Sequence, residues 1–224
     1  VSEFVNAGHA VIIQNNAGVG SAISNDDFIE AGATIVATAD EVWQKADLIL
    51  KVKEPLEPEY SKLRQGQILF TYLHLAASKE CTDALVASGT TAFAYETVEV
   101  NGTLPLLAPM SEVAGRLATQ VGASALQRPN GGRGVLLGGV PGVAPGRVVV
   151  IGGGVAGLNA AVIAMGMGAD VTVFDRSINR LQYIDIVYGG RIKTLVASKH
   201  AIERELKEAD LVIGAVLVHG AKAP

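Results

Sequence analysis

The sequence has one cysteine, no excess of basic residues and no long uninterrupted apolar run. Cys81 has no partner for an intrachain disulfide, which suits a reducing cytoplasm. Lys and Arg number 18 against 22 Asp and Glu, and this net charge of −4 argues against a nucleic-acid binder. Glycine or charge interrupts the apolar runs well short of a membrane span, and no signal peptide is visible. We expect a cytoplasmic protein with no nucleic-acid or membrane partner and no metal site.

Hydrophobic residues make up 49% of the 224 positions, which allows a substantial core in one large or two small domains. Short β-like runs alternate with helical runs on both sides of a joint near residues 105–109, and this alternation predicts parallel sheets flanked by helices. We predict two Rossmann-like α/β domains at residues 1–105 and 129–224, connected by a helix within 106–128. The chain opens with Val1 inside a helical pattern and stops soon after an apolar strand. We therefore expect a fragment in which both domains are incomplete.

Individual elements follow from periodicity and turn residues. Strands are expected at residues 10–14, 34–37, 48–52, 67–72, 91–95, 148–151, 171–174, 191–197 and 211–215. Helices are expected at residues 25–31, 41–46, 78–87, 112–127, 178–187 and 201–209. Asn25 and Ser111 are predicted to cap the first and the longest of these helices, because short polar side chains accept hydrogen bonds from first-turn N–H groups. Residues 129–146 are expected to form an irregular linker or hairpin in which Arg133 could touch a phosphate.

The stretch GGGVAG at residues 152–157 lies between an apolar run and an alanine-rich helical stretch, and a second apolar run then ends at Asp175. This strand–turn–helix–strand–acid order is the fingerprint of a dinucleotide site. Gly152 permits the tight turn, Gly154 leaves room for a pyrophosphate, and Gly157 lets the helix approach the strand. The N-terminus of the helix then offers unpaired N–H groups to the phosphates.

Asp175 bears on the choice of cofactor. A carboxylate at this position accepts hydrogen bonds from a ribose diol and repels a 2′-phosphate. NAD is therefore favoured over NADP, although the neighbouring Arg176 softens that preference.

Two residues of the first half follow neighbouring predicted strands. Alternation along the strand at 48–52 puts Lys51 and Lys53 on one face, and His74 follows the strand at 67–72. For each residue alone there is a structural alternative: a solvated lysine paired with a glutamate, or a structural histidine between leucines with its hydrogen bonds satisfied. Sequential strands tend to be neighbours and ligands bind beyond their carboxyl ends, so Lys53 and His74 are expected in one cleft. A fixed cation and a group that titrates near neutrality suit proton transfer on a small carboxylate substrate.

Seven ordered stretches together resemble the alanine dehydrogenase/pyridine nucleotide transhydrogenase family, and within it the bacterial alanine dehydrogenases. They are KVKEP at 51–55, FTYLHLAA at 70–77, AYETVE at 94–99, LPLLAPMSEVAGR at 104–116, GGRGVLLGGVPGV at 131–143, GGGVAG at 152–157 and ADLVIGAVLV at 209–218. These stretches cover nearly the whole chain and are far more specific than the glycine motif alone.

The resemblance implies the reversible NAD-dependent conversion of L-alanine to pyruvate and ammonium, in an enzyme that is usually a homohexamer. Lys53 would bind the substrate's carboxylate and carbonyl oxygen, His74 would take part in acid–base chemistry, and Tyr72 would line the pocket. The implied cofactor contacts, together with the motif glycine Gly152, are Ser111, Gly154, Val155, Ala156, Gly157, Asp175, Arg180, Val216 and Leu217.

The resemblance also has gaps. An N-terminal strand whose arginine clamps the substrate carboxylate and a later strand whose aspartate assists protonation are both missing, and His219 stands where the family usually has proline. Two other functions stay open, the NAD(H)-binding subunit of a proton-translocating transhydrogenase and a nonfunctional remnant. That subunit usually lacks the lysine–histidine pair, so Lys53 and His74 favour the dehydrogenase.

Overall fold

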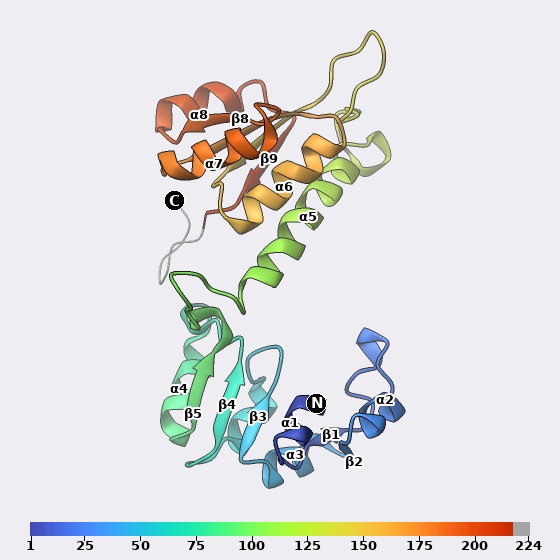
Figure 1. Ribbon diagram of the computed structural model, residues 1–224, viewed down its shortest axis with the longest axis vertical. Coiled ribbons are helices and arrows are strands. Elements are labelled where there is room, and N and C mark those ends of the chain that lie inside the picture. The colour runs from blue at the N-terminus through green and yellow to red at the C-terminus, as the bar shows by residue number, and fades with distance from the viewer. Residues whose placement is uncertain (217–224) are drawn as a thin grey trace. The chain divides into compact units, whose positions relative to one another are not determined.

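The computed structural model describes residues 1–216 and divides the chain into two compact units, Val1–Leu104 and Pro105–Pro224 (Figure 1). The division falls a few residues before the long helix α5 (Ala108–Ala125), which belongs to the second unit. Within the described residues, none of the helices combines the length and the apolar character that a membrane crossing requires.

The strands of the first unit are all parallel, but they form two sheets instead of one continuous sheet. The two-stranded sheet pairs β1 (Ile12–Gln14) with β2 (Thr34–Val36), and the three-stranded sheet has the order β3 (Leu48–Leu50), β4 (Ile68–Thr71), β5 (Thr91–Ala94). In the larger sheet Leu50 lies opposite Phe70 and Phe70 opposite Phe93, so the three strands reach the same edge. The segments that follow them therefore leave from one edge.

Short helices and turns connect these strands: α1 (Ser2–Asn6), α2 (Asn25–Glu30), α3 (Ala39–Lys45), α4 (Lys79–Ser88) and the 3-10 turns Val19–Ser21, Glu57–Lys62, Leu75–Ala77 and Tyr95–Thr97. The predicted cap of α2 is wrong by one residue. Ser24 Oγ accepts from the Asp27 N–H at 3.1 Å, and the Asp27 carboxylate accepts from the Ser24 N–H at 2.7 Å. This reciprocal pair satisfies two terminal N–H groups. Asn25 instead donates from its side-chain amide to Asn15 Oδ1 at 2.6 Å.

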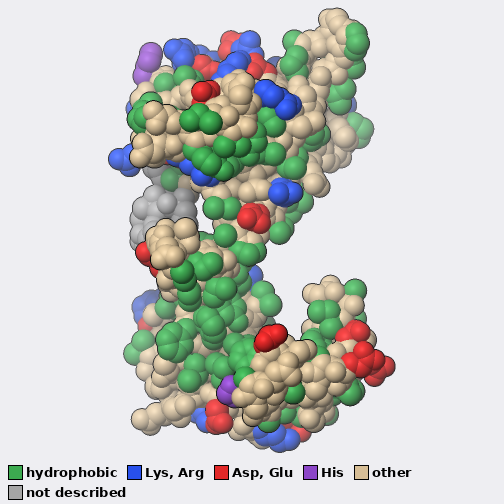
Figure 2. Space-filling view, in the orientation of Figure 1, with side chains coloured by type: hydrophobic (Ala, Val, Ile, Leu, Met, Phe, Trp, Pro, Cys, Tyr) green, Lys and Arg blue, Asp and Glu red, His purple; other side chains and the backbone are tan. Residues whose placement is uncertain are grey.

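The core of the first unit lies on one face of the three-stranded sheet. Its buried members are Trp43, Ile49, Leu63, Leu69, Leu73, Cys81 and Leu85. On the opposite face the side chains of Leu48, Leu50, Ile68 and Phe93 are 38–52% exposed, and hydrophobic side chains gather over these strands in Figure 2. We call these four residues the uncovered face. Parallel sheets are normally covered on both faces, so this unit buries less apolar surface than its sheet offers.

The second unit contains one parallel sheet of order β8–β7–β6–β9. Its strands are β6 (Arg147–Ile151), β7 (Asp170–Asp175), β8 (Lys193–Val196) and β9 (Leu211–Gly214), and its helices after α5 are α6 (Val155–Gly166), α7 (Ile178–Tyr188) and α8 (Lys199–Leu206). Along the chain this is the order third, second, first, fourth, which is the start of a doubly wound nucleotide-binding sheet. Branched side chains fill both faces of the central strands, and Val148, Val150 and Val173 are fully buried.

Ser111 does not cap α5, contrary to the prediction. The helix begins three residues earlier, at Ala108, and the Ser111 N–H already donates to Leu107 O at 3.2 Å. Pro109 explains the earlier start, because a proline in the first turn loses an N–H group that has no helical partner there.

Small residues form the buried face of α5. A methyl group on Gly115 would lie 2.1 Å from Ala156 O, and Thr119 Oγ1 donates to Ala160 O at 2.9 Å. Helices α5 and α6 therefore run side by side at very close range (Figure 1). Val113, Leu117 and Val121 recur at helical spacing and form an apolar stripe along α5, but all three are more than half exposed. Leu126, just after the helix, is buried.

Candidate functional site

The glycine turn after β6 is built around close backbone approaches. Gly152 has φ +101°, and a Cβ there would lie 2.6 Å from Ala215 O. A Cβ on Gly157 would lie 1.7 Å from Gly152 O, so this position in the first turn of α6 requires glycine. Gly154 differs, because a Cβ there would meet no atom within 4 Å. Two glycines are thus required by the fold, while Gly154 leaves open space beside the start of α6.

The first N–H groups of α6 lie beside that open space. The first hydrogen bond within the helix runs from the Leu158 N–H to Gly154 O at 2.9 Å, so the N–H groups of Val155, Ala156 and Gly157 precede it. Such N–H groups together with the helix dipole make a binding site for an anionic group. A phosphate is the group that the fingerprint predicts at this position.

Asp175 ends β7 next to the glycine turn. Its carboxylate accepts from the Gly153 N–H at 2.7 Å and from the Ser177 N–H at 2.8 Å, and it retains further lone pairs. Arg180 donates from Nε to Gly153 O, and its guanidinium lies 5.2 Å from the ring of Tyr183. Asp175 and Arg180 are thus both held against the turn.

Of the other predicted cofactor contacts, Val216 lies near Gly152, since a Cβ on that glycine would be 3.2 Å from Val216 Cγ2. Ser111 lies one helical turn before Gly115, which abuts Ala156 at the start of α6. Leu217 and His219 lie outside the described residues.

Arg133 does not lie near the glycine turn, contrary to the suggestion that it could touch a phosphate. Its Nη1 pairs with Asp210 Oδ1 at 3.1 Å, and Asp210 also accepts from the Arg147 N–H at 2.9 Å. Arg147 and Asp210 stand at the beginning of β6 and immediately before β9. Arg133 is therefore held at the amino-terminal edge of the sheet, at the opposite end of β6 from Gly152.

In the first unit, the segments after β3 and β4 are tied together by hydrogen bonds. Thr71 Oγ1 donates to Lys53 O at 2.8 Å, and the Tyr72 N–H donates to Val52 O at 3.2 Å. These bonds hold Lys53 and the residues leading to His74 at one edge of the sheet, as the sequence predicts from the neighbouring strands.

The prediction that strand alternation places Lys51 and Lys53 on one face is wrong, because β3 ends at Leu50 and the alternation stops there. The Lys51 ammonium pairs with Glu59 and lies 5.8 Å from the ring of Trp43. Lys53 is exposed, and its side chain forms no ion pair within residues 1–216. Of the two, Lys53 is the cation available to a ligand.

His74 adopts a left-handed backbone conformation with φ +48°, which is rare for a residue other than glycine. Glu96 holds this turn, because its carboxylate accepts from the His74 N–H at 2.7 Å and from the Leu73 N–H at 3.0 Å. The imidazole is 40% exposed, and its Nδ1 lies 3.6 Å from Glu54 Oε2. Its exposure and its acidic neighbour differ from the surroundings of a histidine buried between leucines.

The ring nearest to His74 belongs to a cluster of aromatic side chains. The ring of Tyr72 lies 6.3 Å from that of His74 and meets Tyr95 edge to face at 4.9 Å. Tyr95 in turn packs against Phe70 at 4.3 Å. Burial raises the pKa of the Tyr95 phenol, with a smaller contribution from Tyr72. The Tyr95 side chain is therefore uncharged at physiological pH.

Glu54 and Glu96 are the polar residues at this edge that the sequence analysis did not select. Both follow strands of the same sheet, Glu54 after β3 and Glu96 after β5. The rule that selected Lys53 and His74, a polar residue just past a strand's carboxyl end, would also have selected these two. That rule could not indicate that both carboxylates pair with the turn at His74, about twenty positions away in the sequence.

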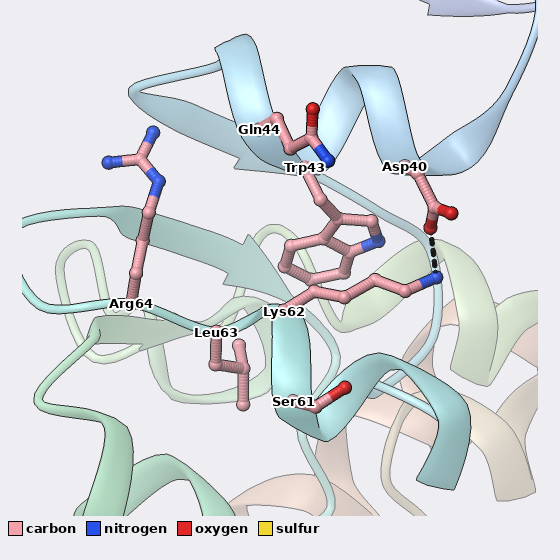
Figure 3. Close-up of a pocket in the computed structure, with 7 residues that line it drawn as sticks. All are labelled: Asp40, Trp43, Gln44, Ser61, Lys62, Leu63 and Arg64. Carbon is pink, nitrogen blue, oxygen red and sulfur yellow. Dashed lines mark ion pairs between the residues drawn. The ribbon is translucent and has the colours of Figure 1, made fainter.

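A separate cavity lies elsewhere in the first unit. It has a volume of about 490 Å³ and is lined by Asp40, Trp43, Gln44, Ser61, Lys62, Leu63 and Arg64. The Lys62 ammonium lies 2.5 Å from Asp40 Oδ1. Figure 3 shows this ion pair and the Arg64 side chain extending away from it. Arg64 also bonds Ala46 O at 2.7 Å, just before β3 begins. The cavity contains none of the predicted site residues.

Two family models match this chain almost end to end. The model described as "Alanine dehydrogenase/PNT, N-terminal domain" matches residues 1–114, and "Alanine dehydrogenase/PNT, C-terminal domain" matches residues 118–224. The chain belongs to the alanine dehydrogenase/PNT family. This confirms the family that the sequence motifs indicate, and the α/β fold agrees with it.

Curated relatives within the family are alanine dehydrogenases. Over the whole chain, the identity is 68% to the protein of Mycolicibacterium smegmatis and 53% to that of Bacillus subtilis, of which the chain covers 61% and 59%. A solved L-alanine dehydrogenase superposes with a TM-score of 0.91 at 51% identity, with 62% of it covered. A transhydrogenase from Sinorhizobium meliloti superposes at 0.82 with 25% identity, with 65% of it covered. The chain therefore spans about three fifths of the length of the curated relatives it matches.

Proposed function

We propose that this chain carries the NAD-binding part and the lysine–histidine part of the substrate site of an alanine dehydrogenase. The reaction is the reversible oxidation of L-alanine with NAD⁺ and water to pyruvate, ammonium, NADH and a proton. The observation that carries the proposal is the placement of Lys53 and His74 after adjacent parallel strands, on segments joined by the Thr71–Lys53 hydrogen bond. In this proposal residues 1–104 are the substrate unit and the rest is the NAD-binding unit.

Lys53 and His74 have different roles in this proposal, one based on charge and the other on proton transfer. The Lys53 ammonium neutralises the carboxylate of alanine or pyruvate and polarises the carbonyl oxygen of pyruvate. His74 exchanges protons with the substrate during the interconversion of amine and ketone, a task for which an imidazole is suited near neutral pH. Tyr72 lines the pocket and limits the size of the substrate side chain.

The second unit fits a pyridine nucleotide. The open space at Gly154 and the unpaired N–H groups of Val155 and Ala156 suit a pyrophosphate, and the Asp175 carboxylate suits a ribose diol. The remaining proposed contacts to the cofactor are Ser111, Gly152, Gly157, Arg180, Val216 and Leu217. Bound NAD supplies the hydride acceptor for alanine oxidation. The negative charge of Asp175 favours NAD over NADP.

We further propose a cytoplasmic homo-oligomer, a hexamer as the resemblance implies. Support comes from the lone Cys81 and from the family to which the chain belongs. Light scattering of the purified protein from the complete open reading frame measures the oligomer directly.

The test is an NADH-consumption assay with pyruvate and ammonium, and the reverse assay with L-alanine and NAD⁺, on the protein from the complete open reading frame. We expect turnover that requires ammonium, that falls at least tenfold when NADPH replaces NADH, and that is lost in Lys53→Met. A protein that binds NADH but gives no ammonium-dependent turnover would instead fit the transhydrogenase subunit. The 51% identity to a dehydrogenase structure, against 25% to a transhydrogenase, supports the first outcome.

A further inference from the structure

The Glu54 side chain is 35% exposed, but one of its two carboxylate oxygens is buried and unsatisfied. Its Oε2 atom is inaccessible to solvent and accepts no hydrogen bond from any of the described residues. Buried carboxylate oxygens are nearly always hydrogen-bonded, because leaving one unpaired is costly. The closest ionic partner of this oxygen is His74 Nδ1 at 3.6 Å, slightly longer than a hydrogen bond. A small rotation of either side chain would bring the two into bonding range.

The backbone of His74 fixes where its ring can lie. Glu96 binds the N–H groups of Leu73 and His74 and holds the left-handed conformation of His74. Those bonds use both carboxylate oxygens of Glu96, since Oε2 also lies 3.2 Å from the Leu73 nitrogen. Glu96 therefore acts on the backbone, and Glu54 is the carboxylate that faces the ring.

Further charged or titratable groups at this edge of the sheet belong to Tyr72, Lys53 and Lys51. The ring of Tyr72 stands 6.3 Å from the imidazole and contributes no negative charge while it is protonated. The Lys53 backbone oxygen is engaged by Thr71, and the Lys51 ammonium is engaged by Glu59. Among the described residues, Glu54 is thus the acceptor placed for a proton on Nδ1.

We propose that Glu54 is a positioning residue for His74. Its carboxylate accepts the Nδ1–H of the imidazole and so fixes the tautomer that leaves Nε2 unprotonated and available to exchange a proton with the substrate. A histidine base oriented by a carboxylate at its other nitrogen is a recurrent arrangement in enzymes. The inference rests on the proposed function for its catalytic meaning, while the tautomer can be measured without turnover.

The experiment uses the protein from the complete open reading frame, labelled with ¹⁵N in its histidine rings, and compares it with Glu54→Gln. Spectra of His74→Gln assign the His74 signals. The matched control is Glu57→Gln, a glutamate of the same connection that is exposed. We expect the Nδ1–H tautomer in the parent protein and in Glu57→Gln, and a mixture of tautomers in Glu54→Gln. We also expect kcat to fall about 10- to 100-fold in Glu54→Gln, less than the complete loss of an acid–base group can cost, with KM for alanine changed less than about threefold.

The outcomes separate the two proposals. An Nε2–H tautomer in the parent protein, or a Glu54→Gln variant with unchanged tautomer and unchanged kcat, would overturn the role of Glu54. A rise in KM with an unchanged tautomer would overturn it as well, because it would assign Glu54 to substrate binding. Absence of alanine-dependent turnover in the parent protein would instead overturn the proposed function, and the tautomer measurement would still test Glu54. The parent spectrum needs only His74→Gln for its assignment, so misfolding of Glu54→Gln cannot hide the result.

Discussion

Lys51 and Lys53 stand two residues apart after the same strand, yet their side chains have different surroundings. Lys51 lies against Trp43 and is paired with Glu59, whose side chain is only 17% exposed. Burial by itself would raise the pKa of Glu59, but the Lys51 ammonium and the Leu56 N–H together lower it below its usual value of 4.5. Lys53 has no such partner among the described residues, so its charge is free to act on a ligand.

The two lysines are therefore expected to respond differently to the same substitution. Lys51→Met removes the partner of a largely buried carboxylate and should lower the free energy of unfolding by about 1–3 kcal/mol near neutral pH. Because the folded pKa of Glu59 is depressed, this contribution is present above pH 4.5 and is lost as the pH falls through the folded pKa. Lys53→Met should leave the unfolding free energy within about 0.5 kcal/mol while activity is lost.

Urea unfolding at neutral and acidic pH, together with alanine turnover, measures both effects. If Lys51→Met lost as little stability as Lys53→Met, the structural assignment of Lys51 would be wrong.

At the scale of elements, the start of α6 shows that the glycines of one motif are there for different physical reasons. Gly157 is required because α6 approaches β6 so closely that a methyl group would overlap Gly152 O. Gly154 has φ −65°, which any residue adopts, and open space where its side chain would be. The fold therefore has no need of glycine at position 154, and a bound phosphate is a physical reason for it.

This contrast gives a matched pair of variants. Gly157→Ala should destabilise the second unit by several kcal/mol, on the order of the largest single-residue effects, because the clash involves backbone that cannot move independently. Gly154→Ala should leave the melting temperature within a few degrees but weaken NADH binding at least tenfold, because its methyl group would occupy the phosphate position. Thermal unfolding and isothermal titration with NADH distinguish the two. Unchanged NADH affinity in a folded Gly154→Ala protein would argue against a pyrophosphate at the turn.

For the whole molecule, the uncovered face of the first unit has consequences for stability. Leu48, Leu50, Ile68 and Phe93 are 38–52% exposed on a parallel sheet, and the five strands of that unit form two sheets that are not joined. Each exposed apolar side chain forgoes roughly 1–2 kcal/mol of the stabilisation that full burial would give.

We expect a polypeptide of these 224 residues alone to be poorly stable and to have little or no alanine dehydrogenase activity. It should bind a hydrophobic dye such as ANS and melt at a lower temperature than the protein from the complete open reading frame, because apolar surface stays exposed. Dye fluorescence, thermal unfolding and the NADH assay on both polypeptides provide the comparison. Robust turnover by the 224-residue chain would refute this expectation.

The sequence by itself determined the family, the alternation of strands and helices, and the placement of Lys53 and His74 at one edge of a sheet. These features depend on local periodicity, on turn residues and on the order of motifs, all of which are read along the chain. It misplaced the caps at Asn25 and Ser111, because several polar residues near a helix start can compete and only the final backbone path decides between them.

Only the tertiary structure decided which partners the polar groups take. Lys51 with Glu59, Arg133 with Asp210, and Glu54 and Glu96 with the turn at His74 are pairs set by how strands and connections pack. The same holds for α5, whose glycines are buried while its apolar stripe is exposed, since close approach to the α6 backbone demands small residues. Charge and hydrophobicity along a chain limit such choices, but the distances that select among them exist only after folding.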